Sequence, residues 1–143
     1  MVKRIAFLLY FVVFFYIVWG IRGEANPELM INISPFKTIG LYIDAYLYGY
    51  TTKLIIFSNL IGNIILFIPL GIFIYTYCFR VGLVTLMFLS IYIPIYIEIV
   101  QYLLHIAGYG TRSIDIDDVL LNMIGIWTGY IVVMIVRKIK RNK

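Results

Sequence analysis

Long apolar runs separated by short polar segments dominate this chain. Four such runs occupy residues 5–21, 54–77, 81–104 and 119–136, and charged residues flank them. Apolar runs of about 18 or more residues are typical of membrane-spanning helices. The pattern therefore predicts an all-α integral membrane protein with a four-transmembrane-helix bundle. Because only residues 78–80 separate the second run from the third, these two helices are expected to be antiparallel neighbours.

The first run has a second interpretation, a cleaved signal peptide, because Gly23 and Ala25 form a small-x-small pair shortly after it. Its bulky aromatic side chains and the closing Arg22 favour a helix that is retained.

The segment between the first two runs, residues 22–53, is mixed rather than apolar. Apolar side chains recur within it at helical spacing, namely Phe36, Ile39, Ile43, Leu47 and Tyr50. This spacing predicts an amphipathic segment in the first external loop, lying on the membrane surface. A structured loop that covers the bundle would give the same pattern, and both interpretations stay open.

Composition agrees with a membrane protein. Hydrophobic residues make up 63% of the 143 residues and charged residues only 13%, whereas soluble domains carry about 25% charged residues. The net charge of +5 comes from basic residues at the ends of apolar runs. We therefore expect the lipid bilayer as a partner and no nucleic acid. The single cysteine, Cys78, excludes an intrachain disulfide.

The basic residues also predict the orientation, because Lys and Arg are retained on the cytoplasmic side. With four spans both termini share one side. That side carries eight basic residues and no acidic one, including the basic tail at 137–143. The other side carries four basic residues and every Asp and Glu outside the runs. We expect a multi-pass protein with both termini in the cytoplasm.

Polar residues inside the runs lie at one depth. At ~1.5 Å per residue, Asn63, Glu98 and Asn122 each lie roughly 4–8 Å to the outer side of the middle of their helices. Asn59 lies four residues before Asn63 and Gln101 lies three residues after Glu98, so each pair shares a helix face. A carboxylate at the membrane centre costs at least ~2.5 kcal/mol and needs a partner. We expect Asn63, Glu98 and Asn122 to face a common cavity at the outer leaflet.

The loop just above this depth carries charged residues that could complete the cluster. Arg112 could fold back and form a forked ion pair with Glu98, while Asp115 and Asp118 would compete for Arg112 or share a cation with Glu98. Alternatives without a binding site stay open. Glu98 and Arg112 could form a purely structural ion pair, and the asparagines could only join helices. The aspartates, including Asp117, could belong to a solvated loop.

The last run carries a packing stripe. Gly125 and Gly129 form a G-x-x-x-G pair, which lets another helix approach closely. Asp115, Asp118 and Asn122 lie on the same stripe at three- and four-residue spacing. We therefore expect this stripe to pack into the bundle.

These fragments, in this order, resemble the VanZ-like family of bacterial membrane proteins over about residues 32–130. The first matches, to N-x-x-P-F and G-N-x-x-x-F-x-P-x-G, are Asn32, Pro35, Phe36, Asn63, Phe67, Pro69 and Gly71. The later matches, to E-x-x-Q and R-x-x-D-x-x-D-x-x-x-N-x-x-G-x-x-x-G, are Glu98, Gln101, Arg112, Asp115, Asp118, Asn122, Gly125 and Gly129. The resemblance adds Pro69 and Gly71 to the residues expected to shape helix packing.

The resemblance implies a location in the bacterial plasma membrane and a role in the cell envelope. The family is named for a protein that gives low-level resistance to teicoplanin, a glycopeptide antibiotic that binds cell-wall precursors. The resemblance therefore implies a resistance phenotype but no particular reaction or binding mechanism.

Three classes of function compete. The helical scaffold favours a non-enzymatic envelope protein that binds a lipid-linked precursor, a glycopeptide or a partner protein at its outer face. The alternative is a membrane enzyme acting on a lipid-linked envelope precursor, with Glu98, Asp115 and Asp118 as acid–base groups or as ligands of a divalent cation. A transporter is disfavoured because the inner half of the runs lacks charges. No metal site is predicted, and the cofactor, the catalytic residues and the oligomeric state stay open.

Overall fold

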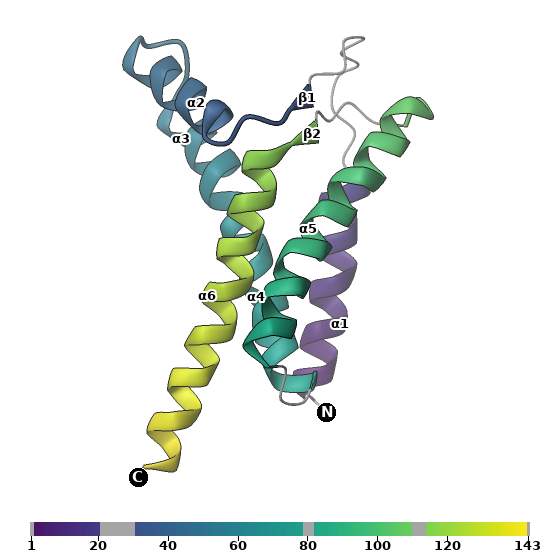
Figure 1. Ribbon diagram of the computed structural model, residues 1–143, viewed down its shortest axis with the longest axis vertical. Coiled ribbons are helices and arrows are strands. Elements are labelled where there is room, and N and C mark those ends of the chain that lie inside the picture. Colours follow the sequence, from purple (N-terminus) through teal and green to yellow (C-terminus); the bar gives the residue numbers. More distant parts are fainter. Residues whose placement is uncertain (1, 21–30, 79–81, 110–113, 143) are drawn as a thin grey trace.

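The computed structural model describes residues 2–20, 31–78, 82–109 and 114–142, and this part of the chain is almost entirely helical (Figure 1). The first half contains α1 (Val2–Phe15), the π-helix η1 (Tyr16–Gly20), β1 (Ile31–Asn32), α2 (Lys37–Leu47) and α3 (Lys53–Ile56). The second half contains the π-helix η2 (Phe57–Ile61), α4 (Gly62–Tyr77), α5 (Leu83–Ile106), β2 (Ile114–Asp115) and α6 (Ile116–Arg141).

Three helices are long and apolar enough to cross a membrane: Lys53–Tyr77, Leu83–Ile106 and Ile116–Arg141. The first apolar helix, Arg4–Gly20, is shorter. The prediction of an all-α membrane protein is confirmed to this extent. The last helix runs to Arg141, beyond the predicted end at residue 136, because the tail residues Arg and Lys favour helix and their charges suit a helix C-terminus.

The helices α1, α4, α5 and α6 form one bundle (Figure 1). Aromatic side chains join the shorter helix α1 to α4. The ring of Phe14 lies 5.2 Å from that of Phe67, and the ring of Phe11 lies 5.1 Å from that of Phe73. Phe14 and Phe67 belong to a buried core completed by Leu86, Ile97 and Ile126. Apolar side chains also cover much of the outer surface, as expected of helices that face lipid.

Glycines bring α4 and α6 into backbone contact. A Cβ atom at Gly71 would overlap the carbonyl oxygen of Ile126, and one at Gly129 would overlap the carbonyl oxygen of Ile68. A Cβ atom at Gly125 would overlap the backbone of α4 in the same way. Close backbone approach over small residues is the usual way in which membrane helices gain van der Waals contact.

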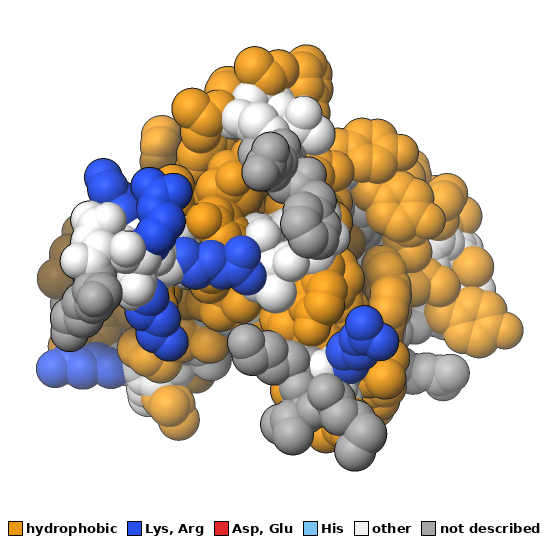
Figure 2. Space-filling model, turned by 90° about the horizontal axis from the view of Figure 1, so that it is seen from below, with side chains coloured by type: hydrophobic (Ala, Val, Ile, Leu, Met, Phe, Trp, Pro, Cys, Tyr) orange, Lys and Arg blue, Asp and Glu red, His pale blue; other side chains and the backbone are white. Residues whose placement is uncertain are grey.

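The two ends of the bundle differ in charge. The end that carries β1, β2, α2 and the start of α6, here called the polar end, holds every described acidic residue (Figure 1). The opposite end, here called the basic end, holds both termini and the last turn of α6, with Lys138, Lys140 and Arg141. Figure 2 views the molecule from the basic end and shows Lys and Arg side chains, with no Asp or Glu visible among the described residues.

The segment between the first two runs contains one helix, α2, which is shorter than its apolar pattern. Phe36 and Tyr50 lie outside α2, Ile39 is half-buried, and Ile43 and Leu47 are exposed. One side of α2 therefore covers the polar end of the bundle while apolar side chains point outward. The half-buried side of α2 agrees with a structured segment that covers the bundle, and its position on the membrane surface stays a prediction.

Candidate functional site

Two short strands join parts of the chain that are far apart in sequence. Strands β1 and β2 pair in parallel, with Ile31 opposite Ile114 and Asn32 opposite Asp115. The side-chain amide of Asn32 donates to the Asp115 carboxylate at 2.9 Å and to the Thr38 hydroxyl at 3.0 Å. The segment before α2 is therefore tied to the start of α6.

Asp115 connects three elements at this point. It is the N-cap of α6, and its carboxylate accepts the backbone N–H of Asp117 at 2.9 Å. An N-cap carboxylate satisfies a backbone donor that the first helical turn leaves unpaired. The backbone N–H of Asp115 donates to Glu98 Oε2 on α5 at 3.2 Å. Glu98 and Asp115 are both buried, so these contacts are shielded from solvent.

Asp117 holds the first turn of α2, a role that the sequence did not reveal. Its carboxylate is fully buried and accepts backbone N–H groups from Phe36 at 2.5 Å, Thr38 at 2.8 Å and Ile39 at 3.1 Å. Phe36 has a φ angle of 65°, in the left-handed region that non-glycine residues rarely adopt. The solvated-loop interpretation is therefore wrong for the buried Asp115 and Asp117.

A second contact links α4 to α6. The amide of Asn63 donates to the Asp118 carboxylate at 2.5 Å. Asn122 follows Asp118 by one helical turn and is only 4% exposed. Its Oδ1 atom is buried and has no hydrogen-bond partner among the described residues. Native proteins rarely leave such an acceptor unpaired.

The structure brings Asn63, Glu98, Asp115, Asp118 and Asn122 together at the polar end, and we call these five residues the polar cluster. Their side chains face neighbouring helices rather than the outer surface. The common cavity expected from their depth stays a prediction.

Four other predicted residues lie apart from the cluster or outside the description. Asn59 is exposed and donates to the carbonyl of Ile55 in its own helix. Gln101 is buried and donates at 3.0 Å to the carbonyl of Val18 in η1. Pro69 is half-buried inside α4. Arg112 lies outside the described residues, as does its pairing with Glu98.

Gln101 contacts the π-helix η1. In a π-helix the backbone bonds run from residue i to i+5, and such turns often occur at functional sites. Within η1, the carbonyl of Val18 accepts the Gln101 amide from α5. No periodicity in the sequence predicts this π-helical turn.

Tyr42 of α2 experiences the negative charge of the cluster. Burial raises the pKa of the Tyr42 phenol above its usual value of 10.0, and the charges of Asp118 and Asp115 raise this pKa further. Within the described residues, no three His, Cys, Asp or Glu side chains are grouped as metal ligands. The cluster is rich in carboxylate and amide oxygens, so its chemistry suits hydrogen-bond donors and cations.

Comparison with known proteins places this architecture in one family. The family model described as VanZ/LLP1 matches residues 4–137, which confirms the resemblance carried by the sequence motifs. No curated protein and no solved structure matches the chain. The match covers almost the whole chain, from the first apolar helix to the last turns of α6, and the protein therefore belongs to the VanZ/LLP1 family.

Proposed function

We propose that this protein binds a ligand or partner at the polar end of its bundle, on the outer face of the bacterial plasma membrane. We further propose that this binding gives low-level resistance to glycopeptides such as teicoplanin. Family membership supports the envelope role. The single observation that carries the binding role is the buried amide oxygen of Asn122, which has no hydrogen-bond partner among the described residues and lies within a cluster of carboxylates.

The proposed topology has four spans, with α1 and η1 as the first. Arg4–Gly20 covers roughly 25 Å at ~1.5 Å per residue, and modest local thinning of the bilayer accommodates a short helix of this kind. Its aromatic packing on α4 supports a place inside the bundle. Both termini lie at the basic end (Figure 1), which the positive-inside rule assigns to the cytoplasm.

The chemistry of the cluster favours one class of ligand group. Glu98, Asp115 and Asp118 supply carboxylates, and Asn122 supplies an amide oxygen to which no described residue donates a hydrogen bond. Such acceptors bind amide N–H, sugar hydroxyl and ammonium groups. They repel anions such as a pyrophosphate. Peptide and sugar portions of glycopeptides, and of lipid-linked wall precursors, present the favoured donors.

Asn122 offers a direct test, because leaving a buried acceptor unpaired costs about 1–3 kcal/mol. If the oxygen has only a structural role, replacing it with an apolar group should be harmless. We expect Asn122→Leu to keep or raise thermal stability, measured on the purified chain in detergent, yet to lose protection against teicoplanin. Susceptibility is compared in a teicoplanin-sensitive strain with and without the expressed protein, and membrane abundance is measured in parallel.

Asn59→Leu is the matched control, since Asn59 is exposed and bonds only within its own helix. It should keep both stability and protection. Full protection by Asn122→Leu would refute a binding role for this oxygen. A wild-type protein that leaves teicoplanin susceptibility unchanged would refute the resistance part of the proposal.

An enzyme acting on a lipid-linked precursor is the second candidate, because buried Glu98 lies among several carboxylates. It ranks lower because the carboxylates of Asp115 and Asp117 bind backbone N–H groups and Asn32, contacts that hold the fold together. Mass spectrometry of a lipid-linked precursor incubated with the purified chain distinguishes an enzyme from a binding protein. Conversion that Glu98→Gln abolishes would establish the enzyme.

A further inference from the structure

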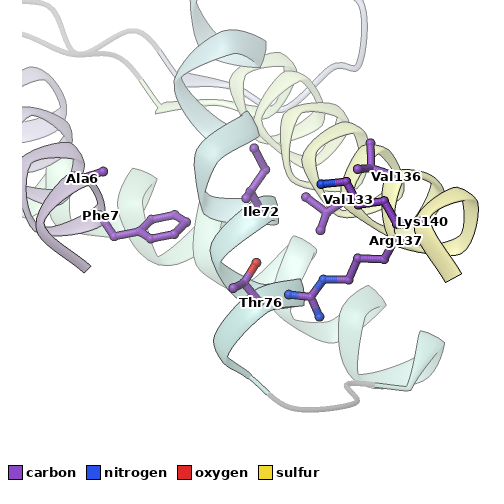
Figure 3. Close-up of a pocket in the computed structure, with 8 residues that line it drawn as sticks. All are labelled: Ala6, Phe7, Ile72, Thr76, Val133, Val136, Arg137 and Lys140. Atoms are coloured by element: carbon purple, nitrogen blue, oxygen red, sulfur yellow. The ribbon is translucent and has the colours of Figure 1, made fainter. Parts of the chain in front are cut away.

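A groove opens at the basic end between α1 and α6, and α4 forms its floor (Figure 3). Its volume is about 490 Å³, within the range of small-molecule sites in proteins. The lining is almost entirely apolar, with side chains such as Phe7, Ile72 and Val133, and Thr76, Arg137 and Lys140 also border the groove. The groove lies at the opposite end of the molecule from the polar cluster.

Helix packing accounts for the groove. Glycines hold α6 tightly against one side of α4, and aromatic rings hold α1 against another side, with Phe7 lying 5.2 Å from Phe73. The two outer helices therefore flank α4 and leave a channel above Ile72 and Thr76. Figure 3 shows Phe7 reaching toward α4 from one side and the Arg137 guanidinium reaching toward Thr76 from the other.

The groove carries positive charge, and no acidic side chain of the described residues lines it. The Arg137 guanidinium lies 4.9 Å from the centre of the Tyr75 ring, a cation–π contact that orients it. In the described part of the chain, neither Arg137 nor Lys140 pairs with an acidic side chain, because the described Asp and Glu residues lie at the polar end. An anionic group would complement this charge.

We propose that the groove binds an anionic glycerophospholipid, with an acyl chain along the apolar walls and the phosphate on Arg137 and Lys140. The apolar walls match the acyl chain of such a lipid, and the two cations, which have no acidic partner in the described part of the chain, match its phosphate. Basic pockets between membrane helices on the cytoplasmic side bind anionic headgroups in this way. The leaflet, but not the lipid chemistry, rests on the proposed topology.

The test uses the full chain purified in an uncharged detergent. Thermal unfolding is measured with added phosphatidylglycerol, which is anionic, or phosphatidylcholine, which is zwitterionic. Phosphatidylglycerol should raise the unfolding midpoint of the wild type, and phosphatidylcholine should not. The double variant Arg137→Gln/Lys140→Gln should lose the phosphatidylglycerol shift.

Lys138→Gln/Arg141→Gln is the matched control, because it removes the same charge from the same helix end without touching the groove. It should keep the shift. Equal loss in both double variants would overturn the proposal in favour of diffuse attraction by the basic tail. An equal shift with phosphatidylcholine, or no shift with either lipid, would also overturn it.

A third variant keeps the proposal testable if the groove double variant does not fold. Val133→Phe fills the groove and leaves every charge in place, and the melting curve without lipid reports whether it folds. Loss of the phosphatidylglycerol shift in Val133→Phe supports binding in the groove. A full shift in this variant overturns it.

Discussion

At the scale of single residues, Asp117 stabilises a helix other than its own. It belongs to the first turn of α6, yet its carboxylate accepts the N–H groups that open α2. Negative charge at a helix N-terminus is favourable, and here one carboxylate lies near the N-termini of both helices. Its bond to the N–H of Phe36 also holds that residue in a left-handed conformation, which costs of order 1–3 kcal/mol.

Asp117→Ala should therefore be strongly destabilising. Three backbone donors lose a charged acceptor, and we expect a loss of about 3–5 kcal/mol in the free energy of unfolding. The α2 segment should detach, so trypsin should cut at Lys37 in the folded protein in detergent. Asp44→Ala, an exposed change on α2 itself, should leave both readouts as in the wild type. Unchanged protection of Lys37 in Asp117→Ala would contradict this role.

The raised pKa of Tyr42 predicts that the stability of the folded protein depends on pH in the alkaline range. Its pKa is raised in the folded state, so the folded protein binds the phenol proton more tightly than the unfolded chain. The resulting stability is fully present below about pH 10, the ordinary pKa of tyrosine, and is lost as pH rises through the folded pKa. Tyr42→Phe should flatten the decline of the melting midpoint above pH 10. Parallel declines for wild type and Tyr42→Phe would show that Tyr42 contributes nothing.

At the scale of elements, glycine decides how closely α4 and α6 pack. Gly71, Gly125 and Gly129 all lie where a side chain would meet the backbone of the neighbouring helix. The Asn63–Asp118 hydrogen bond spans the same pair of helices nearer the polar end. The close packing therefore also positions the polar cluster.

Gly129→Ala should separate α4 from α6 and cost about 1–3 kcal/mol, because the new methyl group would overlap the carbonyl of Ile68. Gly62→Ala is the control on α4, where a Cβ atom would meet no other atom within 4 Å. It should be neutral or stabilising by up to about 1 kcal/mol, from helix propensity alone. Thermal unfolding in detergent compares them, and equal midpoints would contradict the packing role.

At the scale of the whole molecule, charge is divided between the two ends of an apolar bundle. The described acidic residues lie at the polar end, and the last turn of α6 and both chain termini lie at the other (Figures 1 and 2). This division is the physical basis of the proposed orientation.

Cys78 provides a native probe of that orientation, because its thiol is free and exposed just after α4. A membrane-impermeant maleimide should label it only after cells are permeabilised. In a Cys78→Ser background, Ser34→Cys, on the exposed segment before α2, should be labelled in intact cells. The reverse labelling pattern would invert the topology.

The sequence alone was sufficient for the features that depend on local composition. Membrane-length helices follow from the length of apolar runs, since burial in lipid needs no distant partner. The glycine stripe of α6 also follows from spacing on a single helix. The family follows from motifs in order, and its model matches residues 4–137.

Only the tertiary structure decided which polar groups meet. Asn59 and Asn63 share a helical spacing, yet Asn63 reaches Asp118 whereas Asn59 bonds to its own helix. The reason is geometric: α6 begins at Ile116, and the α3–η2 segment diverges from it at this end (Figure 1).

The partners of Asp117 were likewise invisible in the sequence, because they are backbone N–H groups about 80 residues away in the chain. A backbone donor has no side-chain identity that a pattern could reveal. The apolar pattern therefore determined the helices of this protein, and the packing of those helices determined where its buried charges found their hydrogen bonds.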